Sequence, residues 1–448
     1  MKKIIICIMF VLCLMTNCRF FSSKENTEVI LGGFSEETLK PIEGKGPYYI
    51  AGYKQGQEIT GVLDYQCVRA FYLSYFGEEV LMISVDCIGL TSNYVEKIRK
   101  GIKKDCNINV MSTHTHAGID TMGLWGGIAL DGKNEAFMNQ LVGLAIKAGN
   151  EAISNACEGK LTYGQIKTEG ILEDSRDPYV YDENIYQLRF IPSNNSSPTR
   201  MMFFGAHAES LRGDNTLLSA DFPGEIAQII KEKTGDNFLF FNGAIGGLIM
   251  TKVFDEEDLV NNMKITAQKI SEYLLKIEEK ELKDKTLKQT TIKFKAKMEN
   301  TLYIYYKFLG ILKNKTSRNF LTGEYYLHTE ISLLQIGEIN FLLIPGEIFP
   351  ELVWGGSYQN NEVKHKNPLS LSAIAEKYNI NNLIIIGLAN DEVGYIVPPS
   401  DYMLNDKYPY INDATDSRGE NHYEETNSLS IDISYQIAYK FEKLCKNK

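Results

Sequence analysis

The chain has 448 residues, of which 44% are hydrophobic and 23% are charged. This composition excludes a disordered, collagen-like or low-complexity protein and leaves ample chain for a large buried core. Lys and Arg number 47 against 57 Asp and Glu, so the formal net charge is −10. On that balance we expect no nucleic-acid partner and no electrostatic attachment to an anionic membrane.

The N-terminus carries an export-signal pattern. Lys2 and Lys3 precede the apolar run Ile4–Met15, which is too short to span a bilayer comfortably. Cys18 closes the pattern and makes it resemble a bacterial lipoprotein signal, although Asn17 stands where such signals usually carry Gly, Ala or Ser. We expect a protein exported to the bacterial cell envelope and anchored in a membrane by a lipid on Cys18, with plain secretion as the alternative.

These features divide the chain into a signal peptide at residues 1–17, a short polar tether at 18–27 and one compact domain at 28–448. The cysteines beyond the tether are odd in number and none forms a CxxC pair, which argues against a disulfide framework or a zinc ribbon. They are Cys67, Cys87, Cys106, Cys157 and Cys445.

Apolar runs bounded by Gly, Pro or Asp alternate along the domain with amphipathic segments, and this alternation predicts a layered α/β fold with a mixed sheet. In chain order, the pattern predicts a buried strand at Val80–Asp86, helices at Tyr94–Lys104, Glu135–Cys157, Asp221–Lys233 and Glu256–Glu279, antiparallel strands at Ile292–Ala296 and Glu330–Ile336, buried strands at Asn340–Pro345 and Asn382–Leu388, and a last helix at Leu429–Leu444.

Three of the six histidines stand at predicted strand ends. His114 and His116 belong to the segment Val110–Gly118 (VMSTHTHAG), and His207 ends the apolar run Met201–His207 (MMFFGAH). Alternate residues of a strand share a face, so the first pair can present both imidazoles to one site. The alternative is a pair of hydrogen-bonded core histidines.

A carboxylate follows another buried strand in the same way, because Leu342–Glu347 (LLIPGE) runs into a Pro-Gly turn and ends at Glu347. A buried carboxylate without a partner costs several kcal/mol, so Glu347 needs either a structural partner or a ligand role. Two histidines and one carboxylate leave open positions on Zn²⁺, as a hydrolytic site requires.

Seven segments, in the right order, resemble the neutral (non-lysosomal) ceramidases, zinc-dependent hydrolases that cleave the amide bond of N-acylsphingosine. The segments are GVLDYQCVRAFYLSYFGEEVLMISVDCIGL (Gly61–Leu90), STHTHAG (Ser112–Gly118), SRDP (Ser175–Pro178), the GAH that ends at His207, IPGE (Ile344–Glu347), GLANDEVGY (Gly387–Tyr395) and HYEE (His422–Glu425). The resemblance implies the α/β catalytic domain of that family without the C-terminal β-domain of its larger members.

The resemblance also implies a ligand set for one zinc ion per chain: His114, His207, Glu347 and Tyr395. The first three coincide with the strand-end residues above. Tyr395 rests on the resemblance alone, and a core tyrosine is the alternative in a chain with 26 tyrosines.

Three further residues match family positions that contact the scissile amide or the substrate head group: His116, Arg176 and Tyr423. An imidazole, a cation and a phenol can each stabilise a developing oxyanion. Alternatively, Arg176 forms a surface ion pair with a neighbour such as Asp174 or Asp177, and Tyr423 packs at a helix entry.

The chain departs from the family in the segment Phe241–Ile249 (FNGAIGGLI). The ceramidases carry roughly Asn-Gly-Asp-Val-Ser-Pro-Asn there, and their serine is essential, whereas this chain has Ala244 for the aspartate and Gly246 for the serine. A zinc-activated water does not need that serine as a nucleophile. The glycines either offer N–H groups to an oxyanion or form a tight turn.

We therefore expect a zinc-dependent hydrolase that cleaves an amide bond of a ceramide-like lipid or a related small-molecule amide. Asp120–Gly132 (DTMGLWGGIALDG) follows the histidine turn, so its Trp125 can line the substrate mouth. Two alternatives stay open: a catalytically inactive surface lipoprotein that binds lipid or glycan, and a metal-dependent esterase on the same scaffold.

Overall fold

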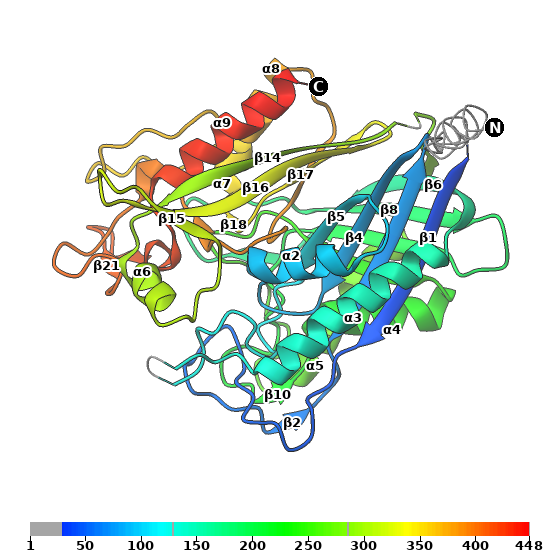
Figure 1. The fold of residues 1–448 in the computed structure, drawn as a ribbon, viewed down its shortest axis with the longest axis horizontal. Helices are drawn as coiled ribbons and strands as arrows, with labels where there is room; N and C mark the ends of the chain where they lie inside the picture. Colours follow the sequence, from blue (N-terminus) through cyan, green and yellow to red (C-terminus); the bar gives the residue numbers. More distant parts are fainter. Residues whose placement is uncertain (1–28, 128–129, 285, 448) are drawn as a thin grey trace, which may run out of the picture.

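The structure is a computed structural model, and it describes residues 29–447 except 128–129 and 285 (Figure 1). The signal peptide predicted at residues 1–17 and the tether at 18–27 lie outside the described residues.

The described residues form a larger, mixed sheet of nine strands. Parallel pairs lie at both edges, where β4 pairs with β5 and β11 pairs with β9, and the strands between them are antiparallel. Across the sheet the order is β11 (Asn237–Asn242), β9 (Thr199–Phe204), β8 (Asn184–Pro192), β6 (Cys157–Lys167), β1 (Ile30–Thr38), β3 (Cys67–Tyr75), β4 (Glu78–Val85) and β5 (Asn107–Ser112), with β13 (Lys280–Glu281) beside β6.

A second sheet of five described strands contains the later predicted strands. Its order is β14 (Leu287–Met298), β16 (Tyr325–Ile336), β17 (Ile339–Leu343) and β19 (Leu383–Ile386), with β15 (Thr316–Arg318) on β16. The two alternating segments pair antiparallel as predicted, with Ile292 opposite Ile331. The apolar runs supply β17 and β19, which pair in parallel.

The two sheets pack face to face, and helices cover their outer faces, which gives four layers (Figure 1). The Phe203 ring of the larger sheet lies 4.7 Å from the Phe341 ring of the second sheet, centroid to centroid. Alternation along each strand sends one side chain to this inner core and the next to a helix, so that Phe71 faces the second sheet and Tyr72 faces the helical layer.

Helices α2 (Ser92–Gly101), α3 (Glu135–Ser154), α4 (Asp221–Thr234) and α5 (Leu259–Leu275) cover the larger sheet, while α7 (Pro350–Trp354), α8 (Leu371–Lys377) and α9 (Asp432–Lys446) cover the second. Two of the predicted helices, Glu256–Glu279 and Glu135–Cys157, were longer than the helices in the structure. α5 begins after Asp258, whose side chain accepts the Asn261 N–H as a cap. α3 ends before Cys157, which is already the first residue of β6.

Short elements complete the described fold. They are the two- and three-residue strands β2 (Gly61–Val62), β7 (Leu172–Asp174), β10 (Leu217–Leu218), β12 (Ile249–Thr251), β18 (Glu347–Ile348), β20 (Tyr395–Ile396), β21 (Ala414–Thr415) and β22 (Asn421–His422), the 3₁₀ turns η1 (Pro399–Asp401) and η2 (Glu424–Asn427), and the helix α6 (Thr301–Phe308). No helix in the described part of the chain is long and apolar enough to cross a membrane. Cys67, Cys87, Cys106 and Cys157 are free thiols, as predicted.

Candidate metal centre and cavity

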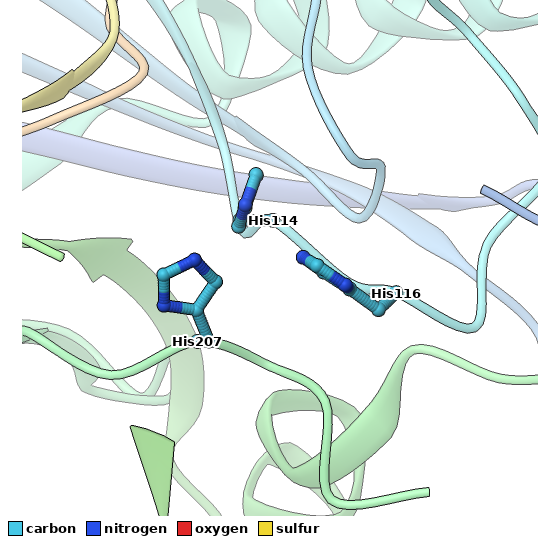
Figure 2. Close-up of side chains that lie close together, drawn as sticks. All are labelled: His114, His116 and His207. Atoms are coloured by element: carbon cyan, nitrogen blue, oxygen red, sulfur yellow. The ribbon is translucent and has the colours of Figure 1, made fainter. Parts of the chain in front are cut away.

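The predicted site residues follow strands of both sheets. His114 comes two residues after β5, and His207 comes three residues after β9. The two segments meet in a parallel bridge between Thr115 and Ala208, and the His116 N–H donates to the Ala208 carbonyl at 2.9 Å. The sheet thus brings three imidazoles to one place, where they face one another in Figure 2.

Hydrogen bonds to backbone carbonyls assign the tautomers of two histidines. His114 Nδ1 lies 2.6 Å from the Ile88 oxygen, and His207 Nδ1 lies 2.9 Å from the Ile249 oxygen. A carbonyl can only accept, so each Nδ1 donates and each Nε2 keeps a lone pair when the ring is neutral. This arrangement is typical of metal-binding histidines, whose second nitrogen is held by a backbone or carboxylate acceptor.

Glu347 stands between these two lone pairs. Its Oε2 lies 3.4 Å from His114 Nε2 and 3.2 Å from His207 Nε2. Burial raises the pKa of this carboxyl, but the neighbouring His114 and His207 outweigh burial and hold the pKa well below its usual range. Three acceptors converging in a buried space require positive charge among them, from protons on the rings or from a metal ion.

The spacing of these three atoms fits a metal ion. In a tetrahedral site with bonds of about 2.0–2.1 Å to nitrogen and oxygen, neighbouring ligand atoms lie about 3.3 Å apart, which matches the 3.4 and 3.2 Å found here. A second, overlapping set is His114, His116 and His207, whose candidate ligand atoms all lie within 4.8 Å of one another. Both sets share His114 and His207.

His116 is the least satisfied group of the cluster. Neither of its ring nitrogens has a hydrogen-bond partner among the described residues, and its ring centroid lies 4.7 Å from that of His114. Burial, reinforced by His114 and His207, lowers the pKa of His116 well below its ordinary value. A neutral, unpartnered imidazole in a cavity wall is available to a ligand or a metal.

Tyr395 and Tyr423 lie beside the carboxylate. β18 pairs in parallel with β20, which places Tyr395 opposite Glu347. The Tyr395 and Tyr423 hydroxyls are 3.1 Å apart. Burial, with the charge of Glu347, raises the pKa of Tyr395 well above its ordinary value, so the phenol is protonated. The metal-ligand role of Tyr395 stays a prediction.

Arg176 is buried among acidic side chains. Its guanidinium donates to Glu424 at 2.9 Å and to Asp401 at 3.1 Å, and lies 2.9 Å from His422 Nδ1. Asp174, the partner considered from sequence, accepts the backbone N–H of Arg176 and not the guanidinium. Arg176 does not line the cavity described below, so its contact with substrate stays a prediction.

A cavity of about 630 Å³ opens in front of the histidines, which is the size of a small-molecule site. Its apolar wall includes Ile88, Met122, Leu124, Trp125, Leu248, Met250, Leu302, Tyr303 and Tyr306, and its polar wall includes Tyr53, His114, His116, Glu209, Arg212, Glu347, Glu392, Tyr395 and Tyr423. Trp125 lines the cavity as expected, because the Asp120 carboxylate accepts the N–H groups of Met122, Gly123 and Trp125 and shapes the loop.

Sequence reasoning missed Glu209 and Glu392. Glu209 accepts the Tyr53 hydroxyl and lies 3.6 Å from both Arg212 Nη1 and His116 Nδ1. One Glu392 oxygen accepts the Gly394 N–H at 2.8 Å, and the other has no partner among the described residues. Their positions in the sequence could have indicated them, since Glu209 follows His207 by two residues and Glu392 precedes Tyr395 by three.

Gly246 packs against the strand that carries Glu347. Its N–H donates to the Ile348 carbonyl at 3.0 Å. A Cβ at this position would stand 2.4 Å from a Phe349 ring carbon and 2.6 Å from the Phe349 nitrogen. Of the two purposes considered for these glycines, this contact supports the tight turn, because the Gly246 N–H is already engaged.

Comparison with solved structures confirms the predicted fold class. A neutral ceramidase from Pseudomonas aeruginosa matches with a TM-score of 0.69 at 15% identity, over 93% of this chain and 74% of that one. A ceramidase complexed with C2 matches with a TM-score of 0.66 at 13% identity, over 93% and 75%. No family model and no curated protein sequence matches. At this identity the likeness shows the shared fold.

Proposed function

We propose that the chain is a zinc-dependent hydrolase that cleaves an amide bond of a ceramide-like, N-acylated lipid. The convergence of His114 Nε2 and His207 Nε2 on Glu347 Oε2, at 3.4 and 3.2 Å, carries this proposal. The ceramidase-like fold and the apolar cavity support it.

In this proposal His114, His207 and Glu347 hold the metal, and Tyr395 is the fourth ligand. Bound there, zinc would act as a Lewis acid and lower the pKa of a coordinated water to about 7. The carbonyl acceptors of Ile88 and Ile249 orient the two imidazoles by holding their Nδ1 protons.

The residues beside the metal ligands would handle the amide. Tyr423 can donate its hydroxyl proton to the carbonyl oxygen as negative charge develops there, which is the oxyanion role that fixed donors perform. His116 is neutral and makes no hydrogen bond to another described residue, so it can hydrogen-bond the reacting group. Arg176, held by Glu424 next to Tyr423, would act by positioning the segment that carries that tyrosine.

The cavity supports a lipid-like amide. Leu124, Trp125, Leu302 and Tyr306 offer an apolar wall, and the hydrophobic effect favours an acyl or alkyl chain along it. Ester substrates fit the same wall, so a metal-dependent esterase remains the alternative within hydrolases.

A matched pair of glutamates tests the metal site. Glu347 and Glu351 are each 6% exposed, and only Glu347 faces the histidines. We expect Glu347→Gln to lose both bound zinc, measured by mass spectrometry, and hydrolysis of an N-acylsphingosine, while Glu351→Gln keeps both. Zinc content that is equal in the two variants would contradict the proposal. Zinc and lipid binding without turnover on amides or esters would instead support an inactive binding protein.

Export and lipidation at Cys18 form a separate proposal, supported by the N-terminal pattern. Metabolic labelling with a palmitate analogue in a bacterial host tests it, because Cys18→Ser should abolish the label and Cys67→Ser should not. A label that survives Cys18→Ser would contradict anchoring at this residue.

A further inference from the structure

Exposed apolar side chains and cations gather on one segment, residues 301–323, which contains α6, β15 and most of the turn before β16. Phe320 and Leu321, at the tip of the hairpin, are each 96% exposed. We call the following residues the basic apolar patch: Tyr305, Lys307, Phe308, Leu309, Lys313, Lys315, Arg318, Phe320 and Leu321.

The helical and hairpin parts of the patch adjoin each other. The Phe308 ring of α6 lies 6.0 Å from the Tyr325 ring of β16, and the Arg318 guanidinium lies 5.2 Å from the centroid of the same Tyr325 ring. Figure 1 shows α6 beside this hairpin at one end of the molecule. The patch is therefore one surface and not two separate ones.

The charge of the patch opposes that of the chain. Residues 301–323 contain four cations and no Asp or Glu, in a chain of net charge −10. None of these four cations forms an ion pair with another described residue. The charge argument made from the whole sequence missed this, because a net charge does not describe a local surface.

The patch also borders the cavity, since α6 contributes to both. Leu302, Tyr303 and Tyr306 of α6 line the cavity, while Tyr305 and Phe308 of the same helix are 51% and 68% exposed. The helix therefore separates the apolar interior of the cavity from an apolar, cationic exterior.

We propose that the basic apolar patch docks on a bilayer that contains anionic lipid, with Phe320 and Leu321 entering the headgroup region. Two protruding side chains on a turn gain burial by insertion into a fluid interface, whereas a flat protein partner could enclose only part of them. Lys and Arg beside aromatic side chains suit an anionic interface, where each cation adds to binding.

This docking deepens the proposed function, because it places the cavity next to the phase in which a lipid amide resides. It rests on the proposed function only for what the cavity binds. Vesicle binding is measured without turnover, so failure of docking and failure of hydrolysis are distinguishable.

Insertion is tested with a tryptophan at the tip of the patch. We expect Phe320→Trp in the full chain to be quenched by vesicles of brominated phosphatidylcholine and phosphatidylglycerol. The control is Phe76→Trp, because Phe76 is 44% exposed in the turn before β4, at the opposite end of that strand from the site. The N-terminal segment is common to both variants, so it does not contribute to the difference. Equal quenching of the two variants would overturn the proposal.

Charge selection is tested with Lys313→Gln, Lys315→Gln and Arg318→Gln combined. Each surface cation adds roughly 1 kcal/mol at an anionic membrane, so three removals should weaken binding to the mixed vesicles by about 100-fold. The control replaces Lys440, Lys443 and Lys446 of α9 by Gln. Equal losses in both triple variants, or equal binding to vesicles without phosphatidylglycerol, would overturn the anionic preference.

A different result would assign the patch to a second copy of the chain and overturn docking on a bilayer. In that case the unaltered chain would bind no vesicles and would be a dimer, while Phe320→Ser would be a monomer.

Discussion

At the scale of single residues, Tyr423 gives a direct test of the chemistry. Its hydroxyl has one hydrogen-bond partner among the described residues, the Tyr395 hydroxyl at 3.1 Å, and Tyr423 lines the cavity. If it donates to the developing oxyanion, Tyr423→Phe should lower kcat by about 10²–10³-fold and leave KM nearly unchanged. Steady-state kinetics on the amide substrate measure this. Tyr402→Phe, which removes a buried hydroxyl away from the cavity, is the control. An unchanged kcat in Tyr423→Phe would exclude the donor role.

Gly246 gives a prediction about stability. Gly246→Ser would place a Cβ 2.6 Å from the Phe349 nitrogen, and backbone cannot move aside as cheaply as a side chain. We expect the free energy of unfolding to fall by about 1–3 kcal/mol, measured by urea denaturation, and no activity to be gained. Gly143→Ser is the control, because a Cβ at that helical position meets nothing within 4 Å. Higher activity in Gly246→Ser would contradict the purely structural role.

Sequence reasoning reached the individual site residues unequally. His114, His207 and Glu347 were reached because each ends an apolar run, and the structure brings them together. The partners of Arg176 could not be read from the sequence. They lie more than 200 residues away, on η1 and η2, and only the folded chain shows which of 57 acidic residues meet one guanidinium.

At the scale of elements, the start of α2 depends on a carboxylate from a distant loop. Asp391 Oδ1 accepts the Ser92 N–H at 2.7 Å and the Asn314 amide at 2.7 Å. Its charge near a helix N-terminus is favourable, but burial outweighs this and raises the pKa of Asp391 to about 7.

This shift makes stability depend on pH. The folded state binds a proton that the unfolded chain releases near pH 4, so unfolding free energy should fall as the pH rises from about 4 to 7, by up to about 4 kcal/mol from this group. Asp391→Asn should remove that part of the pH dependence, as measured by denaturation at a series of pH values. Asp406→Asn, at an exposed position, should leave the pH dependence intact. If the unaltered protein and both variants showed the same dependence of unfolding free energy on pH, Asp391 would not be its source.

Arg176 links its own segment to two elements, because its guanidinium binds η1 through Asp401 and η2 through Glu424 and Glu425. Arg176→Met would leave the buried Glu424 and Glu425 without this cation, while Asp401 would keep Arg418 at 3.6 Å. We expect a loss of about 3–5 kcal/mol in unfolding free energy. Arg189→Met, which leaves Asp236 still paired with Arg200, should cost less. Thermal and chemical denaturation compare the two, and equal losses would show that the cluster around Arg176 has no special weight.

Continuous apolar strands were predictable, whereas the long strands β1, β3, β6 and β8 of the larger sheet and the shortest strands were not predicted. β4, β17 and β19 are continuous apolar runs, so burial on both faces could be inferred from composition. β18 and β20 have two residues each, too few for any periodicity. Their pairing sets Glu347 opposite Tyr395, and it follows the parallel pairing of β17 and β19 earlier in the same two segments.

At the scale of the whole molecule, the candidate metal ligands come from both sheets. His114 and His207 follow β5 and β9 of the larger sheet, while Glu347 and Tyr395 follow β17 and β19 of the second. The metal would tie together two sheets that also meet through an apolar core and through hydrogen bonds, such as the one from the Val110 N–H to Asn390 Oδ1 at 2.9 Å.

Removal of the metal by a chelator should therefore destabilise the contact between the two sheets as well as the metal site. Removal of a ligand that binds only the folded state lowers stability by RT ln(1 + [L]/Kd), and here the loss would fall on the seam between the sheets. We expect hydrogen exchange to speed up together at Val110–Ser112 and at Phe341–Leu343, but not in the outer helix α9. A substitution that weakens packing anywhere between the two sheets would then displace the metal ligands, even when it lies far from them. Selection for catalysis would therefore act on the whole inner core of the protein.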